Sequence, residues 1–318
     1  MSVKSKVAEI LERNAGQAVS GQELADSLGV SRAAVWKAVK QLQEQGYRIS
    51  AGRNKGYILQ PDTDVLSEGG IRLYLSEKYR EIPVEVLSTV DSTNSAAKAA
   101  ALRGMPHGTI IAAQEQTAGR GRLGKSFYSP PDTGLYMSVI LKPDISLADS
   151  TLLTAAAACA VSDGIQQLCG EETQIKWVND IFCHGRKICG ILTEAISDFE
   201  SGTAETVIVG IGLNLTTGDF PAELQNTAGS LGIPLQRSRL CADIACRLLD
   251  YSEILGSPEL MEKYRSRSMV LGREVSFEQR GRLRTGKAVA IDDSGCLVVD
   301  TAEGQEKLRA GGIVVLPE

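Results

Sequence analysis

The sequence contains little histidine and no closely spaced cysteine pair, and these absences exclude several kinds of site. The chain has only His107 and His184, and its seven cysteines include no C-x-x-C pair. No zinc-type cluster is therefore visible in the sequence, and we expect no protein-bound metal. Because the number of cysteines is odd, we expect free thiols in a reducing cytoplasm rather than a disulfide framework. Cys183 and Cys189 are interpreted as packing residues.

A long hydrophobic run and an N-terminal signal are also missing. Charged residues begin at Lys4, and the longest stretch of small apolar residues, 154–161, is far too short to span a bilayer. We therefore expect a cytoplasmic protein with no membrane association. The chain contains no internal repeat and no low-complexity segment. Its net charge of −5 excludes a nucleic-acid polycation, so any contact with DNA must come from a local patch.

The length of 318 residues corresponds to about two domains, with room for a small third. Residues 61–64, Pro-Asp-Thr-Asp, are typical of a linker. We expect domains at 1–62, 66–268 and 269–318. The chain is long enough to bury a sizeable core.

The first 60 residues have the pattern of a winged helix-turn-helix. Apolar spacing predicts helices over 4–14, 21–28 and 32–45. Ser20 and Glu23 form a capping box at the second helix, and Gly29 ends it. Residues 47–50 and 57–59 flank a glycine-bounded turn, which predicts a β-hairpin, or wing.

This module has the charge of a DNA-binding surface. Between residues 31 and 57 there are six basic residues and a single acid, Glu44. A recognition helix places its N-terminal half against base edges, and wing cations suit phosphate contacts. The alternative is a winged-helix module used only for protein contacts or autoinhibition. The predicted DNA-binding residues are Ser31, Arg32, Ala33, Trp36, Lys37, Lys40, Arg53 and Lys55. Since a single winged helix binds weakly, operator binding implies a dimer.

The rest of the chain predicts an α+β fold with a mixed or antiparallel sheet, because it has many strands and few helices. From residue 274 onward, short strands divided by glycines predict a small all-β barrel of about 45 residues. The expected strands are 84–90, 109–113, 135–141, 174–177, 187–194 and 207–214, and the expected helices are 95–102, 149–168, 239–255 and 259–267.

The most distinctive stretch is a positive glycine-rich loop at residues 116–126. Residues 119–125 hold three glycines and three cations with no acid. Glycine lets backbone N–H groups approach a ligand, and arginine supplies forked donors for phosphate or carboxylate. Residues 119–124 also fit G-x-G-x-x-G, but the prolines and turn residues that follow exclude the helix that a dinucleotide fingerprint requires. The remaining interpretations are a loop that closes over a small anion and a solvated basic surface loop.

Three further polar stretches lie at strand ends or glycine turns: residues 91–94 (Asp-Ser-Thr-Asn), 176–180 (Lys-Trp-Val-Asn-Asp) with 185–190, and 210–214. Ser92 or Thr93 taken alone would be interpreted as a helix cap, and Asn214 as a turn residue. Four such stretches in one domain favour a site.

In order and spacing these motifs resemble those of biotin protein ligases, and the N-terminal module makes the whole chain similar to the bifunctional type that is also the biotin operon repressor. The resemblance implies a central domain related to class II aminoacyl-tRNA synthetases and an SH3-like C-terminal barrel. It implies biotin and ATP as substrates, Mg²⁺ with ATP, a biotin carboxyl carrier protein of acetyl-CoA carboxylase as acceptor, and operator DNA. It further implies a homodimer that is promoted by the biotinyl-adenylate.

The resemblance also implies roles for individual residues. Lys187, Arg122 and Asp180 are the catalytic candidates; Asp180 would orient or deprotonate the acceptor amine, or else be structural. Val178, Leu123 and Phe127 depart from commoner family sequences, but none of the three departures removes a charge that the mechanism needs. Biotin or the adenylate would be held by Ser92, Thr93, Asn94, Gln116, Arg120, Gly121, Arg122, Lys176, Lys187 and Asn214.

Two other functions remain open from the sequence. A lipoate-protein ligase has a related fold, although the winged helix and the glycine-arginine loop favour biotin. A ligand-sensing repressor without catalysis is the second alternative, and the presence of Lys187, Arg120 and Asp180 argues against it.

Overall fold

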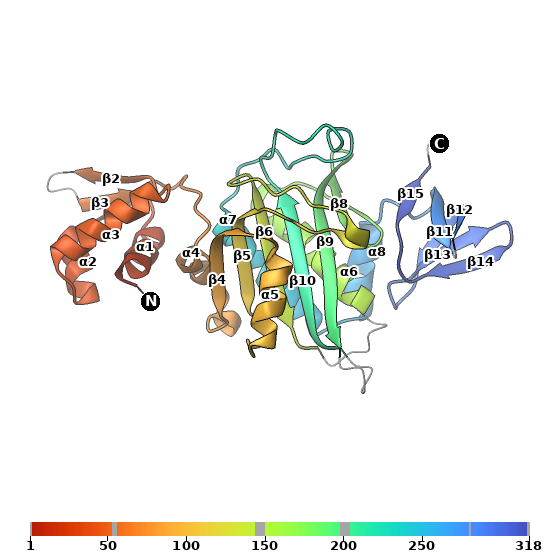
Figure 1. Ribbon diagram of the computed structural model, residues 1–318, viewed down its shortest axis with the longest axis horizontal. Coiled ribbons are helices and arrows are strands. Elements are labelled where there is room, and N and C mark those ends of the chain that lie inside the picture. The colour runs from red at the N-terminus through yellow and green to blue at the C-terminus, as the bar shows by residue number, and fades with distance from the viewer. Residues whose placement is uncertain (1, 53–55, 144–149, 198–203, 280, 317–318) are drawn as a thin grey trace.

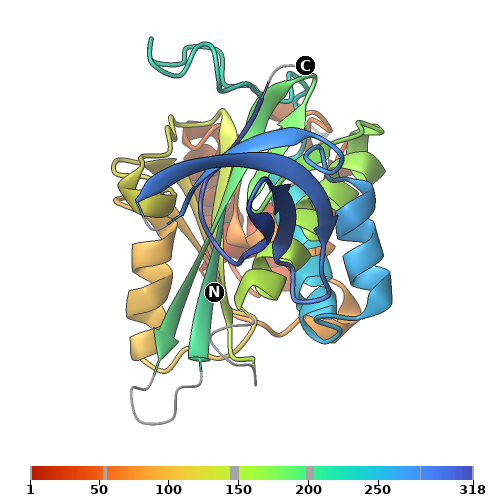
Figure 2. The ribbon, with the colours of Figure 1, turned by 90° about the vertical axis from the view of Figure 1, so that its right-hand side faces the viewer.

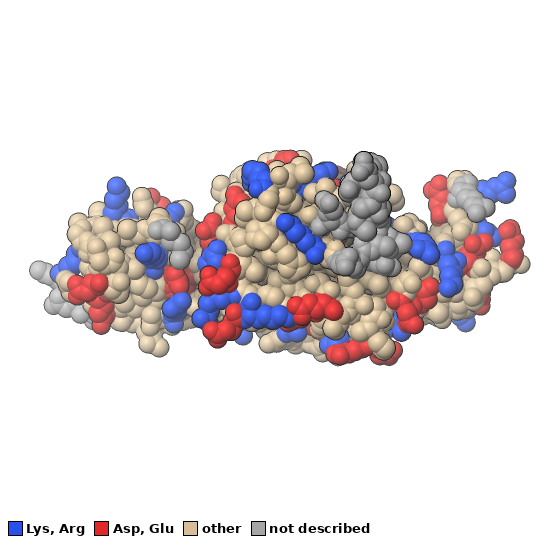
Figure 3. Space-filling view, turned by 90° about the horizontal axis from the view of Figure 1, so that it is seen from below, with Lys and Arg blue, Asp and Glu red and all other residues tan. Residues whose placement is uncertain are grey.

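The computed structural model describes residues 2–52, 56–143, 150–197, 204–279 and 281–316. The molecule is elongated, with the winged helix at one end, a large sheet in the middle and a small sheet at the C-terminal end (Figure 1). Acidic and basic side chains are interspersed along the face seen in Figure 3.

The N-terminal module is a winged helix-turn-helix, as predicted. Its helices are α1 (Val3–Arg13), α2 (Gly21–Leu28) and α3 (Arg32–Glu44), and its sheet has the order β1-β3-β2, with β1 (Ala18–Val19), β2 (Ile49–Gly52) and β3 (Gly56–Leu59). The capping box is confirmed: the Ser20 hydroxyl accepts from Glu23 N at 3.0 Å, and a Glu23 carboxylate oxygen accepts from Ser20 N at 2.8 Å. Gly29 adopts a left-handed φ of 64° that ends α2. Strand β1 was not expected.

The segment after the wing is held against the central unit. Pro61 O accepts from Nε2 of Gln236, and the carboxylate of Asp64 accepts from Nε of Arg237 at 2.8 Å. Arg237 is only 3% exposed and also pairs with Asp132. Helix α4 (Glu68–Tyr74) and a 3-10 turn, η1 (Glu77–Tyr79), follow and were not expected from the sequence.

The central unit is built on a seven-stranded sheet of order β4-β5-β6-β10-β9-β8-β7. Among its described strand pairs only β4 and β5 are parallel, so the mixed sheet and the α+β class are confirmed. The short strand β8 was missed because it has only four residues, the first of which, Asp180, ends the polar motif 176–180. The strands are β4 (Val84–Val90), β5 (Ile110–Gln116), β6 (Gly134–Leu141), β7 (Gln174–Lys176), β8 (Asp180–Cys183), β9 (Arg186–Ser197) and β10 (Ala204–Asn214).

Helices cover both faces of this sheet (Figures 1 and 2). Helix α5 (Thr93–Leu102) packs through Ala97 and Ala100 on one face. On the other face lie α6 (Ser150–Cys169), α7 (Arg237–Ser252) and α8 (Pro258–Ser266). Within α6, residues 151–169 are apolar and long enough to cross a membrane by composition, but 72% of an 18-residue window of this stretch is buried inside the protein.

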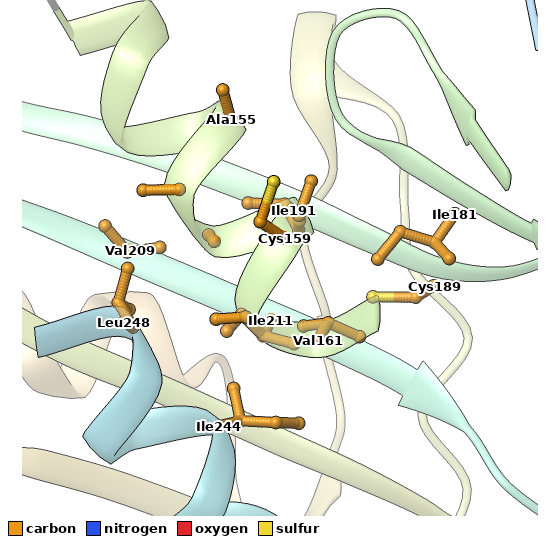
Figure 4. Packing of buried hydrophobic residues seen from close by; sticks show 14 of the residues in the cluster. Ala155, Cys159, Val161, Ile181, Cys189, Ile191, Val209, Ile211, Ile244 and Leu248 are labelled. Carbon is orange, nitrogen blue, oxygen red and sulfur yellow. The ribbon is translucent and has the colours of Figure 1, made fainter. Parts of the chain in front are cut away.

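Cys159 and Cys189 are buried core residues. Cys159 lies on α6 and Cys189 on β9, and both are fully buried among aliphatic side chains such as Ile191 and Val209 (Figure 4). Burial raises the pKa of Cys159 to about 12, so it is an unreactive core thiol. All seven cysteines are free, as expected.

The C-terminal unit is a five-stranded antiparallel sheet of order β14-β13-β12-β11-β15. Its apolar residues, including Val275, Phe277 and Leu308, belong to the same buried cluster as the core of the central unit. The division into domains at 66–268 and 269–318 therefore stays a prediction. The strands are β11 (Glu274–Gln279), β12 (Arg282–Ile291), β13 (Leu297–Thr301), β14 (Gly304–Leu308) and β15 (Ile313–Val315).

Candidate functional site

One pocket of about 550 Å³ collects all four polar stretches singled out in the sequence. It lies over the strand ends of β5, β9 and β10, between the N-terminus of α5 and the glycine-rich loop. Every predicted catalytic and substrate-binding residue lines it: Ser92, Thr93, Asn94, Gln116, Arg120, Gly121, Arg122, Lys176, Asp180, Lys187 and Asn214.

Glycines on β9 and β10 make the floor of this pocket. A Cβ placed on Gly212 would lie 2.6 Å from the ring of Phe127, and one on Gly210 would lie 2.0 Å from Oδ1 of Asn94. Gly190 on β9 also lies under the Phe127 ring, which a Cβ at that position would approach to 3.3 Å. The missing side chains therefore allow an aromatic ring and an amide to lie directly on the sheet.

The N-terminus of α5 supplies a hydrogen-bonded polar wall. Gln116 Oε1 accepts from both the backbone N and the hydroxyl of Thr93, at 2.8 and 3.2 Å. Nε2 of Gln116 donates to the hydroxyl of Ser129 at 2.8 Å. Ser92 occupies the N-cap position but its side chain makes no capping hydrogen bond. A simple capping role therefore does not explain Ser92.

Two residues that the sequence analysis missed hold Asn94 in place. The buried hydroxyl of Ser138 donates to Oδ1 of Asn94 at 2.7 Å, and Glu194 accepts from Nδ2 of Asn94 at 2.8 Å. Glu194 also forms an ion pair with Arg120 of the glycine-rich loop. Ser138 and Glu194 lie inside predicted strands, so no local signal distinguished them from ordinary strand residues.

Among the described residues, five cations and one acid line the pocket, in a chain whose net charge is −5. Nζ of Lys187 lies 2.7 Å from Oδ1 of Asp180, and Nη1 of Arg122 donates to Oδ1 of Asn179 at 3.1 Å. Burial lowers the pKa of Lys176. The charge of Asp180 partly offsets this lowering, and the charge of Lys187 adds to it. The pocket is therefore suited to bind an anion of high charge.

Asn214 at the end of β10 and Gly311 in the C-terminal unit complete the site. Asn214 ends β10 and is 4% exposed; its Nδ2 donates to Gly229 O, while its Oδ1 has no partner among the described residues. This buried oxygen is free to accept from a ligand. Nη1 of Arg122 also donates to Gly311 O at 3.4 Å, so the C-terminal unit reaches the pocket.

The second predicted surface lies on α3. Trp36 is 57% exposed, while Val35 and Leu42 on the opposite side of the helix are buried. The described members of the predicted DNA-binding set are all exposed: Ser31, Arg32, Ala33, Trp36, Lys37 and Lys40. Arg53 and Lys55 lie outside the described residues. Arg48, another of the six basic residues between 31 and 57, pairs with Asp62 at 2.7 Å.

Comparison with known proteins identifies the three parts of the chain. Residues 3–58 match the model of an HTH domain, residues 86–214 that of the biotin/lipoate A/B protein ligase family, and residues 270–316 that of the biotin protein ligase C terminal domain. The bifunctional ligase/repressor BirA of Bacillus spizizenii is 35% identical over 321 residues, covering 98% of each chain. This chain belongs to the family of bifunctional BirA ligase/repressors.

Two further similarities fit this family. The biotin--[acetyl-CoA-carboxylase] ligase of Mycobacterium tuberculosis is 32% identical over 247 residues, or 73% of this chain and 89% of that protein. The biotin protein ligase of Aquifex aeolicus, solved in complex with biotin and ATP, superimposes with a TM-score of 0.63 at 26% identity and covers 74% of this chain and 99% of its own. The chain is accordingly a biotin ligase that carries a repressor-type DNA-binding module.

Proposed function

We propose that the ligase activity attaches biotin to a lysine of the biotin carboxyl carrier protein of acetyl-CoA carboxylase, in two steps within the pocket described above. The observation that carries this proposal is the glycine-floored pocket that five cations and a single acid line within the described part of the chain. Biotin and ATP are the substrates, and both steps gather negative charge at the centre of these cations.

Biotin lies against the Phe127 ring and the Asn94 amide, which cover the floor glycines. Its ureido ring needs paired donors and acceptors in an otherwise apolar pocket, which Ser92, Thr93, Asn94 and Gln116 supply beside the Phe127 ring. Ser138 fixes Asn94 and so reduces the conformational entropy that binding must remove. Gly121 lets the loop backbone approach the ligand.

In the first step a carboxylate oxygen of biotin attacks the α-phosphorus of ATP, the bond to the bridging oxygen breaks, and pyrophosphate leaves. Arg122, Lys176 and Lys187 stabilise the negative charge that develops. Mg²⁺ would enter bound to the phosphates of ATP and would neutralise their charge further. Asp180, the one carboxylate among the described pocket residues, is already paired with Lys187. We therefore assign the protein no metal ligand for this step.

In the second step the amine of the carrier lysine attacks the acyl carbon, AMP leaves and an amide forms. The amine must first lose a proton, since its unperturbed pKa is about 10.4. In one role, Asp180 orients this amine or accepts its proton. In the other, Asp180 positions Lys187 through their ion pair. The two roles differ in which step Asp180→Asn slows.

The glycine-rich loop closes over the adenylate, because a mixed anhydride hydrolyses if water enters. Leu123 is 79% exposed on this loop, and Arg120 reaches Glu194. Closure brings Arg120 toward the phosphate. Biotin plus ATP should slow proteolysis of the loop; an unchanged cleavage rate would remove the closing role.

The DNA-binding module makes the chain a repressor of biotin genes that acts as a homodimer in the cytoplasm. The exposed basic face of α3 and the seven free thiols support this proposal. The adenylate tightens dimerisation and operator binding by linkage, because it orders loops that the dimer needs ordered. Sedimentation with and without biotinyl-adenylate tests it: equal dimerisation in both would contradict it.

ATP- and biotin-dependent labelling of a carrier domain tests the ligase proposal directly. We expect a carrier lysine to gain biotin only when both substrates are present. Lipoate in place of biotin should give no product, and labelling with lipoate alone would favour the related lipoate ligase. No labelling with either would leave only a ligand-sensing repressor.

A further inference from the structure

A cluster of three different metal-binding side chains lies outside the pocket, at the turn between β8 and β9. Glu171 follows the C-terminus of α6, Cys183 ends β8, and His184 is the next residue in the turn. Nε2 of His184 lies 3.0 Å from Oε2 of Glu171, and Sγ of Cys183 lies 3.8 Å from the same oxygen. All three donor atoms lie within 4.8 Å of one another.

These spacings are close to those of a metal-bound set. Tetrahedral zinc takes sulfur at about 2.3 Å and nitrogen or oxygen at about 2.0–2.2 Å, which separates neighbouring donors by roughly 3.3–3.8 Å. Two of the separations are 3.0 and 3.8 Å, so small side-chain rotations would complete the geometry. Within the described part of the chain, no other group of three such residues meets this spacing.

The chemistry of the donors selects the class of metal. A thiolate, an imidazole and a carboxylate suit zinc and related first-row transition metals, whereas magnesium and calcium prefer oxygen donors alone. Cys183 is 4% exposed and has only long contacts among the described residues, to Glu171 and to Glu172 O at 3.7 Å. The side chain of His184 is 74% exposed, so solvent can reach a fourth position.

We propose that Glu171, Cys183 and His184 bind a divalent transition metal ion of the zinc class, with water as the fourth ligand. Such an ion would join the C-terminus of α6 to the β8–β9 turn. Without it, the contact between Glu171 and the exposed imidazole of His184 is of little energetic value.

The position of this turn gives the metal a structural role next to the active pocket. Gly185 lines the pocket, and Arg186 donates from Nη1 to Gln225 O at 2.6 Å. Lys187 N donates to Thr227 O at 3.2 Å. A metal ion at His184 would therefore restrain the turn that places Lys187 and the loop around residue 227.

Cobalt(II) titration of the full-length, chelator-treated chain tests the site, because a cobalt–thiolate bond absorbs in the near ultraviolet. We expect one cobalt ion to bind with this absorption and zinc to displace it. Cys183→Ser should abolish the absorption, and His184→Ala and Glu171→Gln should weaken binding at least about tenfold. Cys246→Ser and His107→Ala are matched controls, since they remove the half-buried Cys246 and the second histidine, and should leave the titration unchanged.

Hydrogen exchange gives a readout that does not involve ligase activity. Zinc should slow exchange of the backbone amides of residues 185–187 in the native chain and not in His184→Ala. His184 is exposed, so its variant folds even if Cys183→Ser does not. Absence of the near-ultraviolet band, or an identical titration for His184→Ala and the native chain, would overturn the site while leaving the ligase proposal intact.

Discussion

Nζ of Lys187 on β9 lies 2.7 Å from Oδ1 of Asp180 on β8. Both side chains are about a quarter to a third exposed, at 34% and 24%, and both line the pocket. The pair places the one acid among the described pocket residues against the cation that we propose for the adenylation step. Because the two residues are paired, each must be substituted separately, and adenylate formation and transfer to the carrier must be measured separately.

Lys187→Met should slow adenylate formation by roughly 10²–10³-fold, because it removes a cation from the site where charge develops on the α-phosphate. Pyrophosphate release in a single turnover measures this step. Lys98→Met, at an exposed position on α5, is the matched control and should behave as the native chain. A native rate for Lys187→Met would exclude Lys187 from the chemistry.

Asp180→Asn should slow transfer from preformed biotinyl-adenylate to the carrier by roughly 10²-fold, because the acceptor amine loses its orienting or basic group. Rapid mixing of the preformed adenylate complex with carrier measures it. If transfer keeps its native rate while adenylation slows, Asp180 acts only by positioning Lys187. If neither step changes, its role is structural.

Gly212→Ala should weaken biotin binding by about 1–3 kcal/mol, or roughly 5- to 150-fold, because its Cβ would lie 2.6 Å from the Phe127 ring and displace it. Calorimetric titration with biotin measures the loss. Gly218→Ala is the matched control, since nothing lies within 4 Å of its Cβ position. In a Phe127→Ala background the Gly212→Ala substitution should cost little, and equal costs in both backgrounds would contradict the steric explanation.

Glu12 should make the stability of the winged-helix module depend on pH. Burial raises its pKa from 4.5 to about 7, although hydrogen bonds from Tyr47 and Ser67 act against the rise. The folded state therefore binds more protons than the unfolded state between these pH values. The unfolding free energy should fall by on the order of 2 kcal/mol as pH rises from about 4.5 to about 7.

Hydrogen exchange of the α1 and α3 backbone amides at a series of urea concentrations measures this dependence. Glu12→Gln should remove most of the slope over that pH range, because the amide keeps a similar shape without titrating. Glu9→Gln, on the same helix, should leave it largely in place. An equal slope in the native chain and Glu12→Gln would assign the dependence to other groups.

Lys37→Ala should weaken operator binding by a similar factor on all sequences and reduce the salt slope by about 1, as expected for a phosphate contact. Trp36→Ala should change the preference between operator variants, because we expect this exposed aromatic side chain in the N-terminal half of α3 to meet base edges. Fluorescence anisotropy at several salt concentrations measures both effects. Native binding by both variants would exclude Lys37 and Trp36 from the DNA contact, whereas no operator binding by the native chain would leave the module with protein contacts only.

The sequence by itself determined the features that depend on local chemistry. Hydrophobic spacing and a capping box are properties of consecutive residues, so α2 was predicted with its observed ends and α3 to within one residue. The glycine-rich loop and the three polar motifs were likewise visible, since each lies within a few positions of the chain. Their shared pocket could be inferred from the strand ends on which they occur.

Only the tertiary structure decided which distant residues contact these motifs. Glu194 contacts Asn94, which lies 100 residues away in the sequence, and Gly311 O contacts Arg122 across 189 residues. Glu171, just after α6, contacts His184 in the β8–β9 turn. Helix α4 and strand β8 are too short for periodicity to identify. Such contacts depend on the order of strands in the sheet, which is set by the burial of whole faces and leaves no trace in local sequence.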